Sequence, residues 1–140
     1  MKYYFAYGSN MSSRRVGQWC RFHRLVGRAT LSDRRFIINV DALATIVPDP
    51  ESNVIGVLWE INSQDEVSLD IYEGVEHGLY TKETVVVSLS DGATVEALVY
   101  VASEDRVGFR RIPDYMKTIL EGAREAGLPE AYLRQVGLLA

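Results

Sequence analysis

The dipeptide Asp91-Gly92 lies between two stretches rich in β-branched residues, TKETVVVSL (81–89) and TVEALVYVA (94–102). Asp-Gly in this setting is a strong signal for a β-hairpin, because glycine adopts the positive φ that a tight hairpin turn needs. Two consecutive strands joined by such a turn are antiparallel. The chain is therefore expected to contain an antiparallel sheet, which disfavours an alternating, doubly wound parallel fold.

Three further segments have the composition of strands. Residues 2–7 combine aromatic side chains with little charge, and residues 27–40 are expected to form a strand, a turn and a second strand. Residues 44–61 are expected to form two strands separated by a Pro48-Asp49-Pro50 turn, because proline cannot donate to a central ladder.

Helix signals are short and lie mostly after the strands. This order predicts an α+β fold, with a mixed, mainly antiparallel, barrel-like sheet and short helices. The signals are Ser12 and Ser13 as caps before a short helix towards Trp19, a Ser63/Glu66 capping box before residues 64–72 with Gly74 as the stop, and Pro113 before a last helix closed by Gly127 and Pro129.

The composition is that of a small globular protein. With 140 residues and 47% hydrophobic content, the chain is expected to form a single domain over residues 1–140. A single cysteine, Cys20, excludes an intramolecular disulfide and suggests a reducing compartment. The sequence shows neither a leader nor an apolar stretch long enough for a bilayer, so a cytoplasmic protein without membrane contact is expected.

Positive charge is concentrated at the start of the chain. Residues 1–40 carry eight Lys or Arg side chains and one acidic residue, Asp33, whereas the whole chain has a net charge of −4. Such asymmetry is compatible with nucleic-acid binding, with attraction of a small anionic substrate, or with two oppositely charged parts packed together. Few aromatic residues lie among the arginines, so we expect a solvated basic face and no nucleic-acid partner.

Two other kinds of site find little support. Cys20 and His23 have a Cys-x-x-His spacing, but only His77 is left to join them, and a structural zinc site needs four ligands. Ser9 lacks the Gly-x-Ser-x-Gly frame of a serine nucleophile. We therefore expect neither a structural zinc site nor a serine nucleophile.

Glu73 is a candidate acid/base. It lies near the end of a predicted helix in LDIYEGVEHGLY (69–80), where the helix dipole is negative, and Asp70 and Glu76 add like charge. These influences, and burial in an apolar cleft, all raise the pKa of a carboxyl group. A carboxyl group tuned in this way can take and return a proton near neutral pH. The alternative is that Glu73 is a solvated residue at a helix end.

The Gly8–Asn10 turn, which follows the first strand directly, is a candidate anion-binding site. A glycine with positive φ would expose successive backbone N–H groups, and the helix that follows would supply more. Such groups hold a carboxylate or a developing oxyanion. The alternative is an ordinary connection between a strand and a helix.

Three segments together resemble one family. Tyr7-Gly8-Ser9-Asn10-Met11 resembles the Tyr-Gly-Ser-Asn-Leu/Met signature of the gamma-glutamylcyclotransferase-like family. Glu73-Gly74-Val75, with Gly78 and Tyr80, resembles the family's Glu-Gly-Val-x-x-Gly-x-Tyr segment, and residues 113–132 are similar to its C-terminal helix region. The three segments follow the family order over most of the chain, and Asn10 makes it more similar to the branch acting on gamma-glutamyl amino acids than to the glutathione-specific branch.

The resemblance implies the family's fold and its reaction. A gamma-glutamyl amino acid or amine would be cleaved by its own α-amine to 5-oxoproline, with Glu73 as the single acid/base and with no metal or cofactor. The implied partner is a small gamma-glutamyl substrate, and the protein is expected to be a monomer or a homodimer. Two alternatives stay open: a non-catalytic module that binds a small carboxylate, and an enzyme for an unusual gamma-glutamyl adduct. The implied substrate-binding residues are Tyr7, Gly8, Ser9, Asn10, Met11, Tyr80, Tyr100 and Tyr115.

Overall fold

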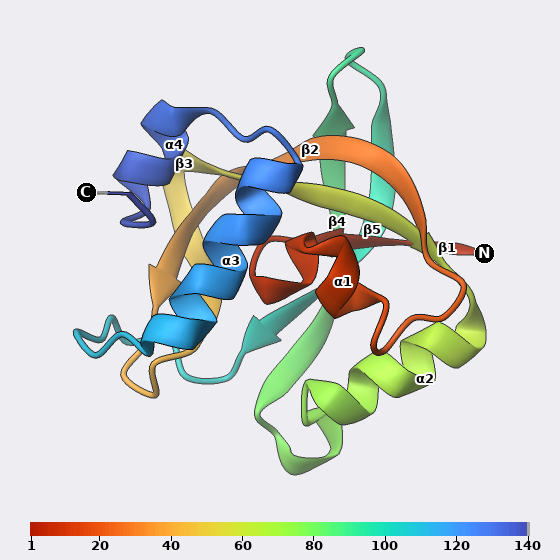
Figure 1. The fold of residues 1–140 in the computed structure, drawn as a ribbon, viewed down its shortest axis with the longest axis horizontal. Helices are drawn as coiled ribbons and strands as arrows, with labels where there is room; N and C mark the ends of the chain where they lie inside the picture. The colour runs from red at the N-terminus through yellow and green to blue at the C-terminus, as the bar shows by residue number, and fades with distance from the viewer. Residues whose placement is uncertain (140) are drawn as a thin grey trace.

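Five strands form a closed barrel in the computed structural model, which describes residues 1–139 (Figure 1). The strand order around the barrel is β1-β3-β2-β4-β5, and all neighbours are antiparallel except β1 and β5. This arrangement confirms the predicted α+β fold with a mixed, mainly antiparallel sheet. The strands are β1 (Lys2–Ala6), β2 (Arg24–Ile38), β3 (Ala44–Ile61), β4 (Tyr80–Leu89) and β5 (Thr94–Ala102).

Helices cover one side of the barrel and one of its ends. Helix α3 runs beside η1 and α1 on the face turned to the viewer in Figure 1, and α2 lies below them. The short helix α4 follows Pro129, where the sequence predicted only the end of the last helix. The helical elements are η1 (Ser9–Met11), α1 (Ser13–Val16), α2 (Ser63–Tyr72), η2 (Val75–His77), α3 (Pro113–Glu125) and α4 (Glu130–Gln135).

The prediction of turns within 27–40 and 44–61 was wrong. Each stretch lies mostly in one continuous strand, and the two strands pair along their length with a register shift between Ser32/Asn53 and Arg34/Pro48. The Asp49 carboxylate accepts hydrogen bonds from the backbone N–H of Glu51 and the hydroxyl of Ser52. The Pro-Asp-Pro segment thus forms a β-bulge and does not reverse the chain. The strand tolerates its prolines because β1 pairs with β3 only over Val57–Ile61, so within residues 1–139 this part of β3 has no strand on its other side.

Local signals set the other boundaries. The hairpin of β4 and β5 turns at Gly92, whose φ is 87°, and α2 ends before Gly74, whose φ is 64°, as predicted. The cap of α2 is Asn62, one residue before the predicted Ser63. The backbone N–H of Asp65 donates to the side-chain oxygen of Asn62 at 2.8 Å, and the backbone N–H of Asn62 donates to the Asp65 carboxylate at 3.2 Å. The capping box is therefore formed by Asn62 and Asp65 in place of Ser63 and Glu66.

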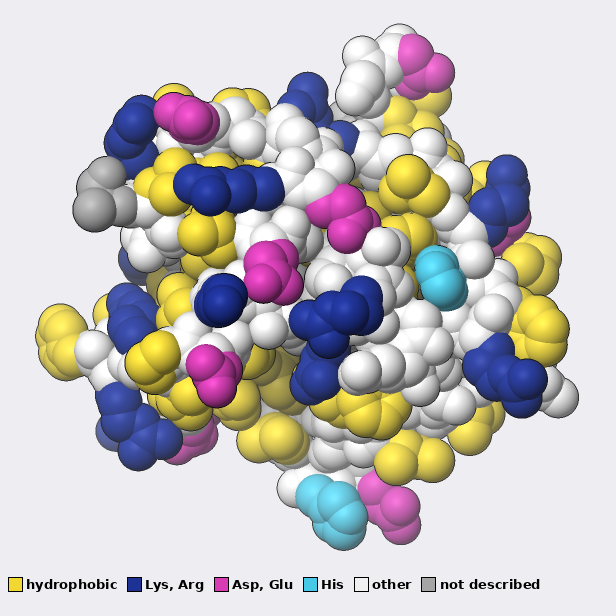
Figure 2. Space-filling view, viewed as in Figure 1, with side chains coloured by type: hydrophobic (Ala, Val, Ile, Leu, Met, Phe, Trp, Pro, Cys, Tyr) yellow, Lys and Arg dark blue, Asp and Glu magenta, His cyan; other side chains and the backbone are white. Residues whose placement is uncertain are grey.

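The basic start of the chain packs against acidic residues from later segments. Arg24 pairs with Glu60 at 2.5 Å, Arg34 with Glu83 at 2.9 Å, and Arg14 of α1 with Glu121 of α3 at 3.6 Å. Figure 2 shows Lys and Arg side chains interspersed with acidic ones over this face. The charge asymmetry along the sequence therefore reflects two oppositely charged parts of one fold. Among residues 1–139, no helix has the length and apolar character needed to cross a membrane.

Close packing holds α3 against the turn that follows β1. Ile119 and Ala123 of α3 are fully buried, and Gly122 lies between them on the same face. A Cβ atom at position 122 would lie 2.4 Å from the backbone nitrogen of Ser12. Only glycine allows α3 to approach this closely, so the position of the turn depends on Gly122.

Candidate active site

A cavity of about 240 Å³ lies between the turn after β1, the C-terminal end of α2 and the start of α3. This is below the usual 300–1,000 Å³ of pockets for drug-sized ligands, so it suits a small molecule. The structure brings eight of the nine residues singled out from the sequence to its wall: Tyr7, Gly8, Ser9, Asn10, Glu73, Tyr80, Tyr100 and Tyr115.

Glu73 caps the C-terminal end of α2, where its backbone N–H donates to the carbonyl of Leu69 at 2.8 Å. Burial raises the pKa of its carboxyl group to about 7, and burial alone accounts for the shift. The expected contribution of Asp70 is absent, because Lys82 lies 3.1 Å from the Asp70 carboxylate and compensates its charge. Within residues 1–139, no cation lies within 4.0 Å of Glu73, so nothing opposes the effect of burial.

The Gly8–Asn10 turn does not use the predicted positive φ, since Gly8 has a φ of −118°. The chain turns through η1, where the N–H of Met11 donates to the carbonyl of Gly8 at 3.1 Å, and such a turn needs no left-handed residue. The backbone N–H groups of Gly8, Ser9 and Asn10 form no hydrogen bond within the described chain. They are left as three donors next to the cavity.

Met11 is the predicted site residue that the structure does not place on the cavity. Its side chain is 1% exposed and belongs to the hydrophobic core. Its N–H group is already used within the turn. Met11 therefore contributes to the packing of the turn.

Buried side chains hold the turn in place. The indole N–H of Trp59 on β3 donates to the carbonyl of Asn10 at 2.9 Å, and the Asn10 amide donates to the hydroxyl of Tyr4 at 3.1 Å. Trp59 and Tyr4 are each 3% exposed. The turn is thus fixed before any ligand arrives, which lets its free N–H groups stabilise an anion without reorganisation.

Two cavity tyrosines bind the same residue of β3. Tyr80 donates to the carbonyl of Ala44 at 2.8 Å, and the hydroxyl of Tyr115 accepts from the N–H of Ala44 at 2.9 Å. Burial raises the pKa of Tyr115 to about 12 and raises that of Tyr80 further. Both hydroxyls stay protonated at neutral pH, and the proton of Tyr115 is left for another acceptor.

The other two predicted tyrosines are linked to each other. Tyr7 donates to the backbone carbonyl of Tyr100 at 2.6 Å. The hydroxyl of Tyr100 donates to the Asp70 carboxylate at 2.7 Å, so Tyr100 contributes its ring to the cavity while its hydroxyl is engaged beside α2.

Sequence reasoning missed other lining residues. Tyr4 lines the cavity together with Glu73, and burial first and the charge of Glu73 second raise the pKa of its hydroxyl. Tyr72 also lines the cavity, and its position directly before Glu73 was an available signal. Leu43 and Ala44 reach the cavity only through the tertiary fold, and no local sequence pattern marks them.

The arrangement supports proton transfer next to an anion. A carboxyl group with a pKa near neutrality shares a cavity with three free backbone donors, and half of the residues that line the cavity are aromatic. Such a carboxyl group can remove a proton and return it, while the donors stabilise negative charge on a neighbouring oxygen. Among residues 1–139, the acidic, histidine and cysteine side chains form no group of three or more that could hold a metal ion.

Comparison with known proteins gave consistent matches. The model of the AIG2-like family matches residues 53–136. Gamma-glutamylcyclotransferase of Mus musculus is 32% identical over 143 residues, covering 92% of this chain and 73% of the relative, and that of Bos taurus is 31% identical, covering 95% and 76%. A solved structure named gamma-glutamyl cyclotransferase superposes with a TM-score of 0.85 at 29% identity, covering 96% of this chain and 85% of the other.

Proposed function

The chain belongs to the gamma-glutamylcyclotransferase-like family and is an enzyme of that type, and on this premise we propose that it cleaves a gamma-glutamyl amino acid or amine to 5-oxoproline and the free amino acid or amine. One observation carries the proposal: the Glu73 carboxyl group and the free N–H donors of the Gly8–Asn10 turn line the same cavity. This is the pairing of a proton-transfer group and an anion site that the reaction needs.

In the proposed reaction, Glu73 enters as the carboxylate and takes a proton from the α-ammonium group of the substrate. The amine then attacks the γ-carbonyl carbon, which forms the ring C–N bond and a tetrahedral oxyanion. Glu73 returns the proton to the amide nitrogen, whose bond to the γ-carbon breaks as the carbonyl reforms. The ring nitrogen loses its extra proton, and the departing amine takes it up as it becomes an ammonium ion.

The nucleophile and the electrophile belong to one molecule, so the enzyme mainly has to hold the substrate in a curled conformation. Holding two reacting groups in place removes much of the entropic cost of their encounter. We assign the glutamyl part to the Gly8–Asn10 turn, whose N–H groups bind either its α-carboxylate or the oxyanion. The rings of Tyr7, Tyr80, Tyr100 and Tyr115 enclose it.

The test is to incubate the protein with a panel of gamma-glutamyl compounds and to measure 5-oxoproline. The panel contains gamma-glutamyl-alanine, gamma-glutamyl amines and glutathione. Turnover of one class supports the proposal and names the substrate class. Failure to form 5-oxoproline from any compound, together with thermal stabilisation by glutamate or 5-oxoproline, would contradict it and favour the binding module considered above.

A further inference from the structure

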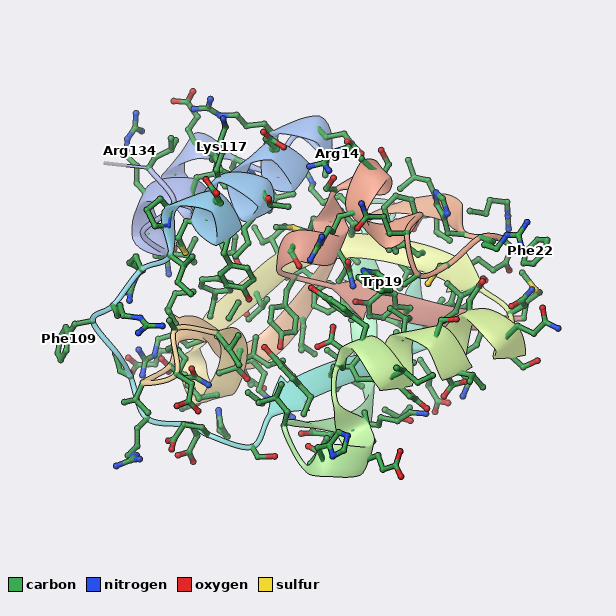
Figure 3. All side chains as sticks on the ribbon, turned by 60° about the horizontal axis from the view of Figure 1, so that its bottom comes forward. Arg14, Trp19, Phe22, Phe109, Lys117 and Arg134 are labelled. Carbon is green, nitrogen blue, oxygen red and sulfur yellow. The ribbon has the colours of Figure 1, made fainter. Side chains whose placement is uncertain are left out.

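Arg15 is held by two aromatic rings, one of which, Tyr72, lines the cavity. Its guanidinium carbon lies 5.8 Å from the ring centroid of Trp19 and 5.4 Å from that of Tyr72, and the two rings stack on each other at 4.2 Å. Figure 3 shows Trp19 near α2, to which Tyr72 belongs. A guanidinium group packed on aromatic faces loses much of its freedom, so its position is fixed before any ligand binds.

The charge of Arg15 is not neutralised by the protein. Within residues 1–139 no carboxylate lies within 4.0 Å of it, whereas its neighbour Arg14 pairs with Glu121 at 3.6 Å. Arg15 donates to the hydroxyl of Tyr72 and to the side-chain carbonyl of Gln18, each at 3.1 Å. A guanidinium group has five N–H donors, so donors remain for an external anion.

Tyr72 connects this cation with the reaction site. It lines the cavity and directly precedes Glu73 in the chain. Tyr115 lines the same cavity. Because Arg15 donates to the hydroxyl of Tyr72 at 3.1 Å, its guanidinium group is in direct contact with a residue of the cavity wall.

We propose that Arg15 binds the α-carboxylate of the amino acid that leaves, and so makes the enzyme prefer gamma-glutamyl amino acids to gamma-glutamyl amines. This inference rests on the proposed function. The glutamyl part is assigned to the Gly8–Asn10 turn and to Glu73, which leaves the cation beyond Tyr72 for the other half of the substrate. Arg15 and Tyr72 are both partly exposed, so this half of the substrate has a route to solvent when the amide bond breaks.

The test compares two substrates that differ only in the carboxylate. Gamma-glutamyl-alanine and gamma-glutamyl-ethylamine are identical apart from that group. We expect the wild-type enzyme to have a kcat/KM about 10- to 100-fold higher for the alanine compound, because a charge-assisted hydrogen bond to the guanidinium group is lost with the amine. In Arg15→Gln this ratio should fall to near one, and Arg15→Lys should restore part of it.

Arg14→Gln is the matched control, since Arg14 is adjacent, carries the same charge and is already paired with Glu121. It should leave the ratio of the two kcat/KM values as in the wild type. A wild-type-like ratio in Arg15→Gln, or an equal loss for both substrates, would overturn the inference while 5-oxoproline formation still supported the proposed function. The absence of 5-oxoproline from both substrates would instead contradict the proposed function itself.

Discussion

The hydroxyl of Tyr7 donates to the backbone carbonyl of Tyr100 at 2.6 Å and joins residues 93 positions apart. Tyr7 directly precedes the Gly8–Asn10 turn, and Tyr100 lies on β5. Tyr7 is the first residue after β1, so this bond connects the chain beyond β1 to β5, the neighbouring strand in the barrel. The place of the turn in the cavity therefore depends on tertiary hydrogen bonds as well as on its own sequence.

Tyr7→Phe should weaken both the fold and the binding of substrate. The substitution leaves a buried carbonyl unpaired, which costs about 1–3 kcal/mol of unfolding free energy. We expect this loss in urea denaturation, together with a higher KM because the turn is held less firmly. Tyr3→Phe is the control, since Tyr3 lies on β1, the strand that leads to Tyr7, and its hydroxyl has no hydrogen bond within residues 1–139. Equal stability of the two variants would contradict the role given to the Tyr7 hydroxyl.

Gly122→Ala should displace the turn from the side of α3. The added Cβ would lie 2.4 Å from the nitrogen of Ser12, which neither backbone can accommodate without moving. We expect a loss of about 1–3 kcal/mol in stability, the usual effect of overpacking, and a fall in kcat. Lys117→Ala, on the exposed side of the same helix, should change neither quantity appreciably. A Gly122→Ala protein with wild-type melting temperature and kcat would show that α3 does not position the turn.

Tyr100→Phe should affect stability more than chemistry. The hydroxyl donates to the Asp70 carboxylate, and a hydrogen bond to a charged group contributes about 1.5–3 kcal/mol. The ring still lines the cavity in the variant, so we expect kcat for 5-oxoproline formation close to that of the wild type. A collapse of kcat without a loss of stability would instead place this hydroxyl in the reaction.

The pKa of Glu73 makes a prediction about stability that needs no substrate. Burial raises this pKa from 4.5 to about 7, so between these pH values the folded protein binds a proton that the unfolded chain does not. Stability contributed by the protonated form is therefore lost as the pH rises through this window, by up to about 3 kcal/mol. Glu73→Gln lacks this titration.

The measurement is urea denaturation of the wild type and Glu73→Gln at pH 4.5 and pH 8. The difference in unfolding free energy should shift in favour of the Gln variant at the higher pH, and titrations common to both proteins cancel. A difference that does not change with pH would mean that the Glu73 carboxyl group is solvated in the folded protein.

Local sequence signals predicted what local interactions determine. The Asp91-Gly92 hairpin and the stop of α2 at Gly74 follow from backbone conformations that glycine favours. The Pro-Asp-Pro segment was read as a chain reversal, but the pairing of β2 with β3 overrode this signal and turned it into a bulge. The order of the strands around the barrel depends on contacts between residues that are distant in sequence, and no local motif predicts it.

In the candidate site, too, the sequence predicted the residues that local motifs mark and missed those that only tertiary contacts bring to the cavity. Glu73 and the Gly8–Asn10 turn were found from motifs, and the cavity joins them. The direction of the Glu73 pKa shift and burial as one of its causes were predicted. The expected effect of the Asp70 charge is absent, because Lys82 on β4, twelve residues further along the chain, compensates that charge. Ala44 was missed because no local sequence pattern marks it, and only the tertiary fold places it against Tyr80 and Tyr115.

The most direct measurement is the rate of 5-oxoproline formation from a gamma-glutamyl amino acid by Glu73→Gln. The control is Glu76→Gln, which removes the same charge from an exposed residue three positions further along. We predict that Glu73→Gln folds normally and loses about 100- to 10,000-fold in kcat, the range for a general acid/base, whereas Glu76→Gln stays close to the wild type. Near wild-type turnover by a folded Glu73→Gln protein would contradict the assignment of Glu73 as the proton-transfer group.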